Sequence, residues 1–462
     1  MTSGRWDPVT GRVRPGTYIN VDGTASDSVQ YGQRGIVLLP LADIGWGANG
    51  SSGTVVTVKA EDIAVYNSEL GDYPYNILML NEALKGASTV KVYIINKGTK
   101  ATNSVELVAA SGSDPAINLV ATAKYGGTRG NDLKVKSTLN TSSKFDVDII
   151  LGTETVETFE DCATAADLIG AGSEYIDFTC TTPATALKAF TSVSLTGGAA
   201  GTVTNTDITD MLDAVEGIVW NTMAFPFTDA ALQTAAISKI KYLRDTIGKS
   251  VQAVLPNAST SSADYEGIIN LVNSVQLEDG TQLTTAQATA WVAAATAAAD
   301  ETVSNTYVNY PGADGIVNAK TNEEIETAIR AGQMCFTYDD DQLPHIEYDI
   351  NSLHTFTEKR PKQYSKNKII RIIDSLCDTI RSTYPPNRFP NNTIGWDRMD
   401  SLGKTILQHY DENGGNGAIM NVDYDNDFLV DRIKSSGDSV YVDVAITPVD
   451  AAEKLYFTVL TR

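Results

Sequence analysis

The sequence predicts a mixed α/β and β multidomain protein, in which an α/β core carries a β-sandwich-like insertion and the N- and C-terminal ends form extended β arms. Three observations support this fold class. Residues 33–98 read as strand, helix and strand, the order of an α/β layer. Residues 99–204 are rich in Thr, Ser, Gly and Val in short alternating runs, which is typical of a β-sandwich. Both ends of the chain carry the period-2 alternation of a strand.

The N-terminal strand lies in RVRPGTYINVDG, residues 12–23. The residues that define its turn and its alternation include Pro15, Gly16, Tyr18, Ile19 and Val21. The segment that follows, DGTASDSVQYGQRG, is polar and loop-like, so no adjacent hairpin partner is available. Because proteins usually cover an unpaired strand edge, this strand is expected to pair with something remote.

The first α/β layer consists of GIVLLPLAD, YNILMLNEALKGA and STVKVYIIN. Ile77, Leu80 and Leu84 stand at helical spacing, and the last segment is the continuous apolar run of a buried strand. The β-rich region contains the short runs DLKVKST, FDVDIIL and ETVETFE, in which the side-chain character alternates from residue to residue. Gly- and Ser-rich turns separate these runs. Since α/β texture resumes afterwards, the β-rich region is interpreted as an insertion.

The central region begins with TDITDMLDAVEGI, where Asp and Thr precede an apolar-periodic helix as capping residues. A second helix, DAALQTAAISKIKYLRDTIGK, leads into the strand-like SVQAVLPN. An Ala/Thr-rich helix lies near residues 276–300. TNEEIETAIRAGQMCFTYDD predicts a helix that ends at Gly332, followed by a strand.

The last hundred residues predict two amphipathic helices, the second ending at Gly414-Gly415, and then two strands in SVYVDVAITPVDAAEKLYFTVL. The apolar stripes are Ile369, Ile372, Ile373, Leu376 and Ile380 in the first helix and Met399, Leu402, Ile406 and Tyr410 in the second. The alternating strand residues are Val440, Val442, Val444 and then Leu455, Phe457, Val459.

Composition excludes several classes of function. Lys+Arg 35 against Asp+Glu 57 gives a net charge of −22, which argues against nucleic acid or an anionic membrane as the main partner. The N-terminus has no apolar signal region, and the apolar stretch at 285–300 is too short and too polar to span a bilayer. The four cysteines stand far apart without C-x-x-C, so free buried thiols are expected, with neither a zinc site nor a disulfide framework.

Two motifs imitate ligand sites. Gly248-Lys249-Ser250 matches the end of a phosphate-binding loop, but Leu243 replaces its first glycine and a helix precedes it, so a helix C-cap is predicted. DYDND at 423–427 imitates a calcium loop, but Phe428 and Lys434 replace the required Gly and Glu. A solvated acidic loop is predicted there, with a weak cation site as the alternative.

No catalytic constellation emerges from the sequence. His345 and His354 are nine residues apart, which is neither a helical ligand spacing nor H-E-x-x-H, and no G-x-S-x-G is present. His345 and Glu347 match a deaminase H-x-E, but the P-C-x-x-C partner is missing. No enzyme activity, metal or cofactor is therefore expected.

One basic strip, KRPKQYSKNKIIR, stands out from the acidic background. It contains Lys359, Arg360, Lys362, Lys366, Lys368 and Arg371 and no acidic residue. It is either a solvated loop that leads into a helix or a basic surface that faces an acidic partner.

Read together, the segments resemble the contractile tail sheath protein of bacteriophages and related contractile bacteriocins, over nearly the whole chain. The resemblance rests on RPGTYINV, AKYGGTRGNDLKV, DINSLHTFT, YSKNKIIRIIDSLCDTI, NRFPNNTIGWDRMDSLGKTILQHY, GAIMNV and VAITPVDAAEKLYFTV, in this order and spacing. The length is similar to that of sheaths of the Gram-positive type.

The resemblance implies a division of the chain into six parts. These are an N-terminal linking arm (1–24), an α/β domain (25–98), the β-sandwich-like insertion (99–204), a central α/β domain with a subtilisin-like fold and no triad (205–345), a C-terminal helical or α+β domain (346–436) and C-terminal linking strands (437–462). The insertion is expected to decorate the outer surface.

The resemblance also implies a function. Subunits would form six-membered rings stacked helically around a tail tube, and contraction would drive the tube through a bacterial envelope, for genome ejection or bacteriocin action. The N-terminal arm would pair with a neighbour's C-terminal strands near 439–447 and 454–460. Lys366, Lys368 and Arg371 are the candidate tube-facing residues.

The implied partners are other copies of the chain, the tube protein, the baseplate and the tail terminator, without direct nucleic-acid contact or membrane insertion. The particle would be made and assembled in the cytoplasm of the host bacterium. Two other classes stay open at this point: a different phage structural or adhesive protein, and an α/β hydrolase. The helices between 365 and 412 argue against an adhesin, which is usually β-rich to its end, and a hydrolase would need a nucleophile beside one of three histidines.

Overall fold

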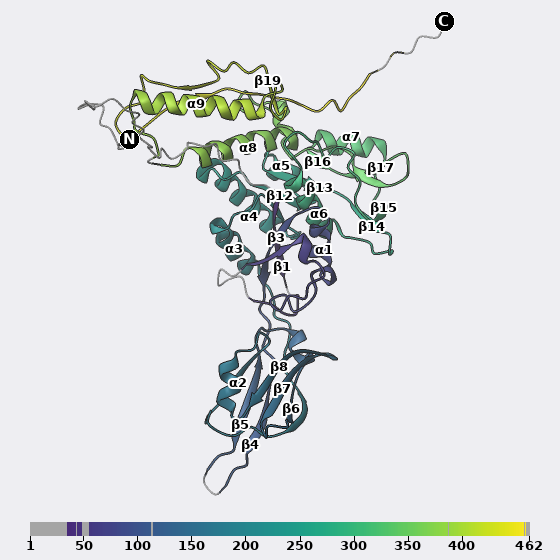
Figure 1. Cartoon of the computed structure of the whole chain (residues 1–462). Helices are drawn as coiled ribbons and strands as arrows, with labels where there is room; N and C mark the ends of the chain where they lie inside the picture. Colours follow the sequence, from purple (N-terminus) through teal and green to yellow (C-terminus); the bar gives the residue numbers. More distant parts are fainter. Residues whose placement is uncertain are drawn as a thin grey trace, which may run out of the picture. The chain divides into compact units, whose positions relative to one another are not determined.

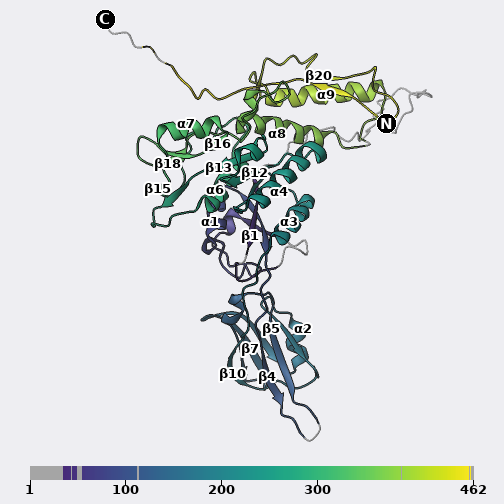
Figure 2. The ribbon, with the colours of Figure 1, turned by 180° about the vertical axis from the view of Figure 1, so that it is seen from behind.

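The computed structural model describes residues 35–42, 44–48, 55–111, 114–386, 388–456 and 458 (Figures 1 and 2). The chain forms two compact units, one of Gln33–Ser375 with Pro448–Arg462 and the other of Leu376–Thr447 with Met1–Gly32. The arm residues Pro15, Gly16, Tyr18, Ile19, Val21, Phe457 and Val459 lie outside the described residues.

The larger unit is built around a seven-stranded sheet in the order β16-β13-β12-β11-β1-β3-β2. Neighbouring strands are parallel, except that β2 is antiparallel to β3. The strands are β1 (Ile36–Ala42), β2 (Val56–Lys59), β3 (Thr89–Ile95), β11 (Thr222–Ala224), β12 (Gln252–Pro256), β13 (Ile268–Leu271) and β16 (Gln333–Met334). The mixed α/β character that the sequence predicts is confirmed.

Helices cover both faces of this sheet, as the two opposite views show (Figures 1 and 2). Side chains of β1 alternate between the two cores: Val37 and Leu39 belong to one, Leu38 to the other. Strands buried on both faces read as continuous apolar runs, which explains GIVLLPLAD and STVKVYIIN. The helices are α1 (Leu78–Leu84) and α6 (Thr285–Ala298) on one face and α3 (Asn205–Ala214) and α4 (Ala230–Lys241) on the other.

Smaller elements complete the larger unit. They are α5 (Thr260–Ala263), α7 (Asn322–Arg330), the antiparallel pair β14 (Ser274–Leu277) and β15 (Ala313–Val317), and the hairpin β17 (Phe336–Tyr338) and β18 (Pro344–Ile346). A π-helical turn, Tyr242–Ile247, extends α4 and is capped by Gly248 at φ +81°. The predicted C-cap at Gly248 is confirmed, because this glycine adopts the left-handed conformation that commonly ends a helix.

The insertion is a β-sandwich of two antiparallel sheets, β10-β6-β7-β8 and β4-β5-β9. Its core includes Leu119, Val135, Ile149 and Phe178, and Trp46 also belongs to it. The predicted sandwich is confirmed. Its elements are β4 (Thr102–Val108), β5 (Ile117–Ala123), β6 (Leu133–Leu139), β7 (Phe145–Leu151), β8 (Glu154–Cys162), α2 (Ala165–Ala171), β9 (Ile176–Cys180) and β10 (Phe190–Ser194).

The predicted amphipathic helices are α8 (Asn367–Thr383) and α9 (Thr393–Tyr410). In the smaller unit, Thr379 of α8 and Tyr410 of α9 hydrogen bond through their hydroxyls at 2.9 Å. The short strands that follow α9 are β19 (Ile419–Met420), β20 (Phe428–Val430), β21 (Val442–Val444) and β22 (Thr447–Pro448).

Of the two predicted C-terminal strands, one forms in the isolated chain. β21 pairs antiparallel with β20, with Val444 opposite Phe428 and Val442 opposite Val430. Residues 451–456 and 458 form no strand, and Leu455 and Tyr456 are 67% and 89% exposed. The second strand therefore does not form from these described residues in a single chain, and its pairing with another subunit stays a prediction, since an extended segment becomes a strand only when another edge supplies its hydrogen bonds.

Cys162 and Cys335 are buried, in line with the prediction, and Cys180 is half-buried. Cys377, however, is exposed, so the expectation of burial is wrong for this residue. Burial raises the pKa of Cys335, with the Glu347 carboxylate adding to the effect, to about 12. Since the thiolate is the reactive form, Cys335 is an inert core residue.

We predict that Gly403→Ala destabilises the smaller unit. A Cβ at this buried position of α9 would lie 2.0 Å from Cδ1 of Phe428, whose ring stacks on Tyr384. Overpacking costs about 1–3 kcal/mol, whereas Gly→Ala in a helix gains about 1 kcal/mol, so the free energy of unfolding should fall. Urea unfolding measures it. Gly170→Ala in α2, where no atom lies within 4 Å, is the matched control and should be neutral or stabilising. A stable Gly403→Ala variant would contradict close packing of Phe428 on α9.

Candidate functional site

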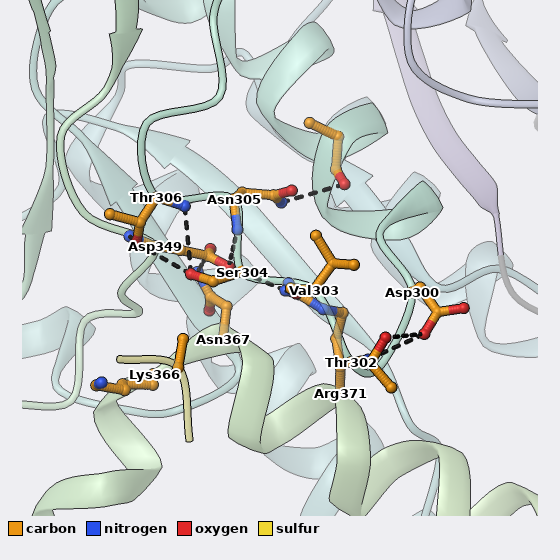
Figure 3. Close-up of polar contacts among 12 residues, drawn as sticks. Asp300, Thr302, Val303, Ser304, Asn305, Thr306, Asp349, Lys366, Asn367 and Arg371 are labelled. Carbon is orange, nitrogen blue, oxygen red and sulfur yellow. Dashed lines mark hydrogen bonds and ion pairs between the residues drawn. The ribbon is translucent and has the colours of Figure 1, made fainter. Parts of the chain in front are cut away.

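A buried carboxylate joins three segments of the larger unit (Figure 3). Asp349 is fully buried and accepts hydrogen bonds from Asn367 Nδ2 at 2.8 Å, the Asn305 backbone N–H at 2.9 Å and Arg371 Nη2 at 3.0 Å. We call these four residues the Asp349 cluster. Asn367 and Arg371 stand one turn apart at the start of α8, so both side chains reach the same carboxylate.

The guanidinium of Arg371 is also fully buried. Its Nη2 donates a second hydrogen bond, to the carbonyl oxygen of Val303 at 2.6 Å, while Nε and Nη1 have no partner among the described residues. Asn367 extends the cluster to the central sheet, because its Oδ1 accepts from Gln252 Nε2 of β12 at 3.3 Å. Burying an ion pair is costly, so this arrangement depends on all its partners being in place.

The C-terminal segment is bound next to the Asp349 cluster. The Glu453 carboxylate accepts from the hydroxyls of Ser304 and Thr306, both at 2.8 Å, and from Lys366 Nζ at 2.6 Å. Lys366 Nζ also contacts Asp450 at 2.8 Å. We call Ser304, Thr306 and Lys366 the cradle.

The cradle is partly buried: the side chains of Lys366 and Glu453 are 16% and 10% exposed. Burial by itself lowers the pKa of Lys366, but the hydrogen bonds that its ammonium donates to Asp450 and Glu453 outweigh burial and raise this pKa above its usual value. Lys366 Nζ also lies 5.7 Å from the ring centre of Tyr348, within cation–π range. The lysine therefore remains charged at neutral pH, and its charge is neutralised inside its own chain.

A groove of about 710 Å³ lies beside the cradle. Residues 450–454 form one side of it, and its other sides include Arg330, Tyr348, Leu353 and Phe356. The bound C-terminal segment is therefore part of the surface of the larger unit.

The predicted tube-facing surface is wrong for two of its three residues. Arg371 is fully buried and Lys368 is 6% exposed, and burial is the largest influence that lowers the pKa of Lys368. Residues 367–370 at the start of α8 are all buried. The positive charge of a residue in this helix therefore did not predict that its side chain is exposed. Lys359 and Lys362 are the members of the strip that are exposed.

The candidate arm residues that the structure describes lie on the smaller unit and on the C-terminal segment. Val440 and Val442 are half-buried, and Val444 and Leu455 are exposed. Within the described residues β20 is the one strand paired with β21, so the other edge of β21 is open. The backbone bonds to β20 use the Tyr441 carbonyl and the Ala445 N–H. Because successive residues of a strand point their backbone groups to opposite edges, Val442 and Val444 present theirs at the open edge.

Neither His345 nor His354 forms a hydrolase triad with the described residues. His345 Nε2 lies 3.1 Å from the Thr337 hydroxyl, which in turn donates to Glu347 at 2.6 Å. His354 Nδ1 contacts the Ser352 carbonyl at 2.9 Å. Among the described residues, no group of three His, Cys, Asp or Glu side chains could hold a metal ion. In the same residues, no helix combines the length and the apolar character that a membrane span requires.

Comparison with known proteins agrees with this architecture. Models of the phage tail sheath protein match in three consecutive regions: the β-sandwich domain at 96–202, the central domain at 201–352 and the C-terminal domain at 359–462. The sheath tail protein of Desulfitobacterium hafniense is similar in sequence (35% identity) and structure (TM-score 0.78), over 96% of this chain and 99% of its own. The chain belongs to the phage tail sheath family.

Two further relatives extend the comparison. The phage-like element PBSX protein XkdK of Bacillus subtilis is 33% identical over 99% of both chains. The helical sheath of the anti-feeding prophage in its contracted state shares the fold, with a TM-score of 0.55 at 11% identity over 97% of this chain and 99% of that chain. The chain is therefore a phage tail sheath protein, and its family is one of structural proteins.

We predict that the buried ion pair of Asp349 and Arg371 contributes far more to the free energy of unfolding than an exposed ion pair does. Arg371→Met leaves Asp349 as an uncompensated buried charge, so the free energy of unfolding should fall by about 3–5 kcal/mol. The double variant Asp349→Asn/Arg371→Met should lose less stability than the sum of the losses in Asp349→Asn and in Arg371→Met, because neither charge remains. Urea unfolding measures all three variants.

The matched control is Arg330→Met, which removes an exposed pair with Glu326 at 2.7 Å. It should change stability by less than about 1 kcal/mol. Equal effects of Arg371→Met and Arg330→Met would contradict the role assigned to the Asp349 cluster.

Proposed function

We propose that the chain polymerises into helically stacked rings of six subunits around a tail tube, and that contraction of this sheath drives the tube through a bacterial envelope. Membership in the sheath family and the match to a sheath tail protein over nearly its full length support the proposal. The observation that carries the linkage between subunits is the open edge of β21.

Strand addition is the linkage that this edge favours. The segment 17–21 of one subunit has the alternation of a strand and no neighbouring hairpin partner in the sequence. Paired with the N–H and C=O groups of Val442 and Val444 in another subunit, it would form a sheet shared between chains. Leu455, Phe457 and Val459 would add a further strand to the same sheet, which accounts for the exposure of Leu455 and Tyr456 in a single chain.

Contraction needs no nucleotide in this proposal. Gly248-Lys249-Ser250 ends a helix and is not preceded by the strand that a phosphate-binding loop requires. Subunits would instead rotate as rigid bodies and gain new interfaces with one another, while the arms keep them connected. The chain acts as a structural protein without catalytic activity or cofactor.

The partners in this proposal are other copies of the chain, the tube protein, the baseplate and the tail terminator, in a phage tail or a contractile bacteriocin particle assembled in the bacterial cytoplasm. Lys359 and Lys362 are the exposed residues of the basic strip that could face an acidic tube surface. The net charge of −22 would keep unassembled subunits soluble.

We predict that the purified chain forms hollow striated tubes in negative-stain electron microscopy and that Val444→Pro does not. Proline removes the N–H that points to the open edge of β21, and edge strands tolerate it without loss of the pairing to β20. A variant without residues 1–21 should also remain dispersed. Val444→Thr keeps the N–H and is the matched control, which should form tubes.

Two outcomes would contradict the proposal in different ways. Dispersed full-length protein across a range of concentrations and salt would contradict self-assembly. Tubes formed by folded Val444→Pro protein would show that the open edge of β21 does not link the subunits.

A further inference from the structure

Residues 449–454 form hydrogen bonds and ion pairs with the rest of the larger unit through two side chains. Within residues 449–454, the hydrogen bonds and ion pairs that reach the rest of the described chain end on the carboxylates of Asp450 and Glu453. No backbone hydrogen bond in the described residues joins this segment to the sheet or to a helix. The polar contacts that hold the segment are therefore ion pairs and hydroxyl hydrogen bonds at the cradle. No backbone hydrogen bond to the sheet or to a helix has to break for the segment to detach.

The cradle itself is rigidly supported. The Thr306 hydroxyl accepts a hydrogen bond from the Asp349 backbone N–H at 3.1 Å while it donates to Glu453. Lys366 directly precedes α8, whose first residue, Asn367, binds Asp349 at 2.8 Å. The Asp349 cluster therefore contacts both sides of the cradle, the loop that carries Thr306 and the helix that begins after Lys366 (Figure 3).

We propose that the cradle is a binding site for the acidic segment Asp450–Glu453 and that this contact acts as a latch that sets the free length of the C-terminal arm. With the latch closed, the free arm begins at Leu455. With the latch open, residues 449–454 join it, and six extended residues add roughly 20 Å of reach at about 3.3 Å per residue. The role of the latch as a reserve of arm length, for subunits that move apart during contraction, rests on the proposed function. The latch contact in the isolated chain does not depend on that function.

The contacts on Lys366 make the latch specific for this acidic segment. One ammonium group faces two carboxylates, and the two hydroxyls of the cradle complete the coordination of Glu453. Loss of the Lys366 charge would leave Asp450 without its partner and Glu453 with hydroxyl donors alone. The latch should therefore open in Lys366→Met and weaken in Glu453→Gln.

Distances between spin labels test the latch in the full-length chain. Spin labels are attached at Ala452→Cys and at Glu323→Cys, an exposed position on α7, in a chain that also carries Cys180→Ser and Cys377→Ser. Double electron–electron resonance then gives the distribution of distances between the two labels. We expect one narrow distribution with the native cradle. In Lys366→Met we expect a broad distribution, because the label then moves on a tether of residues 449–452, whose reach is about 13 Å at about 3.3 Å per residue.

Lys454→Met is the matched control, because it removes a neighbouring lysine that lies 5.9 Å from the Tyr348 ring and makes no ion pair with Asp450 or Glu453 in the described contacts. It should keep the narrow distribution. A broad distribution with the native cradle, or a narrow one in Lys366→Met, would overturn the latch. Since these measurements use unassembled protein, a result for the latch is independent of whether tubes form.

Discussion

The buried carboxylate of Asp349 is the constraint on which the rest of the larger unit depends. A charge removed from water requires charged or polar partners, and the chain supplies them from residues 303–305 and from α8. The same contacts fix the first turn of α8 and the loop that carries Ser304 and Thr306. One buried charge therefore determines where a long helix begins and where the C-terminal segment can bind.

The architecture separates a rigid core from the parts that are proposed to link subunits. The seven-stranded sheet is buried between two helical layers, and side chains such as Leu38 and Trp291 are inaccessible to water. The linking parts have few contacts of this kind: β21 has an open edge, and residues 449–454 depend on two carboxylates. A sheath whose subunits rotate as rigid bodies needs this combination, because the core must keep its shape while the connections between chains change length or direction.

Much of the fold could be predicted from local patterns. The buried strands, the alternating strands of the sandwich and the apolar stripes of α8 and α9 each depend on neighbours a few residues apart, so their periodicity is visible in the sequence. The cap at Gly248 could be predicted for the same reason.

The candidate site could not be predicted in this way. Arg371 is paired with a carboxylate 22 residues away, Asn367 contacts Gln252 at a separation of 115 residues, and Lys366 meets Glu453 at a separation of 87. Six basic residues without an acid therefore looked like a surface, although Arg360, Lys366 and Arg371 pair with carboxylates elsewhere in the chain. Leu455, Phe457 and Val459 were predicted as a strand from their alternation, but the described residues 451–456 and 458 pair with no described strand of the single chain.

Helical reconstruction of assembled tubes by electron cryomicroscopy tests the central claim most directly, because it shows what occupies the open edge of β21. The account predicts that residues 17–21 of a neighbouring subunit lie along Val442 and Val444 as an added strand. Tubes in which this edge faces solvent, or is covered by the N-terminal segment of its own chain, would contradict the account.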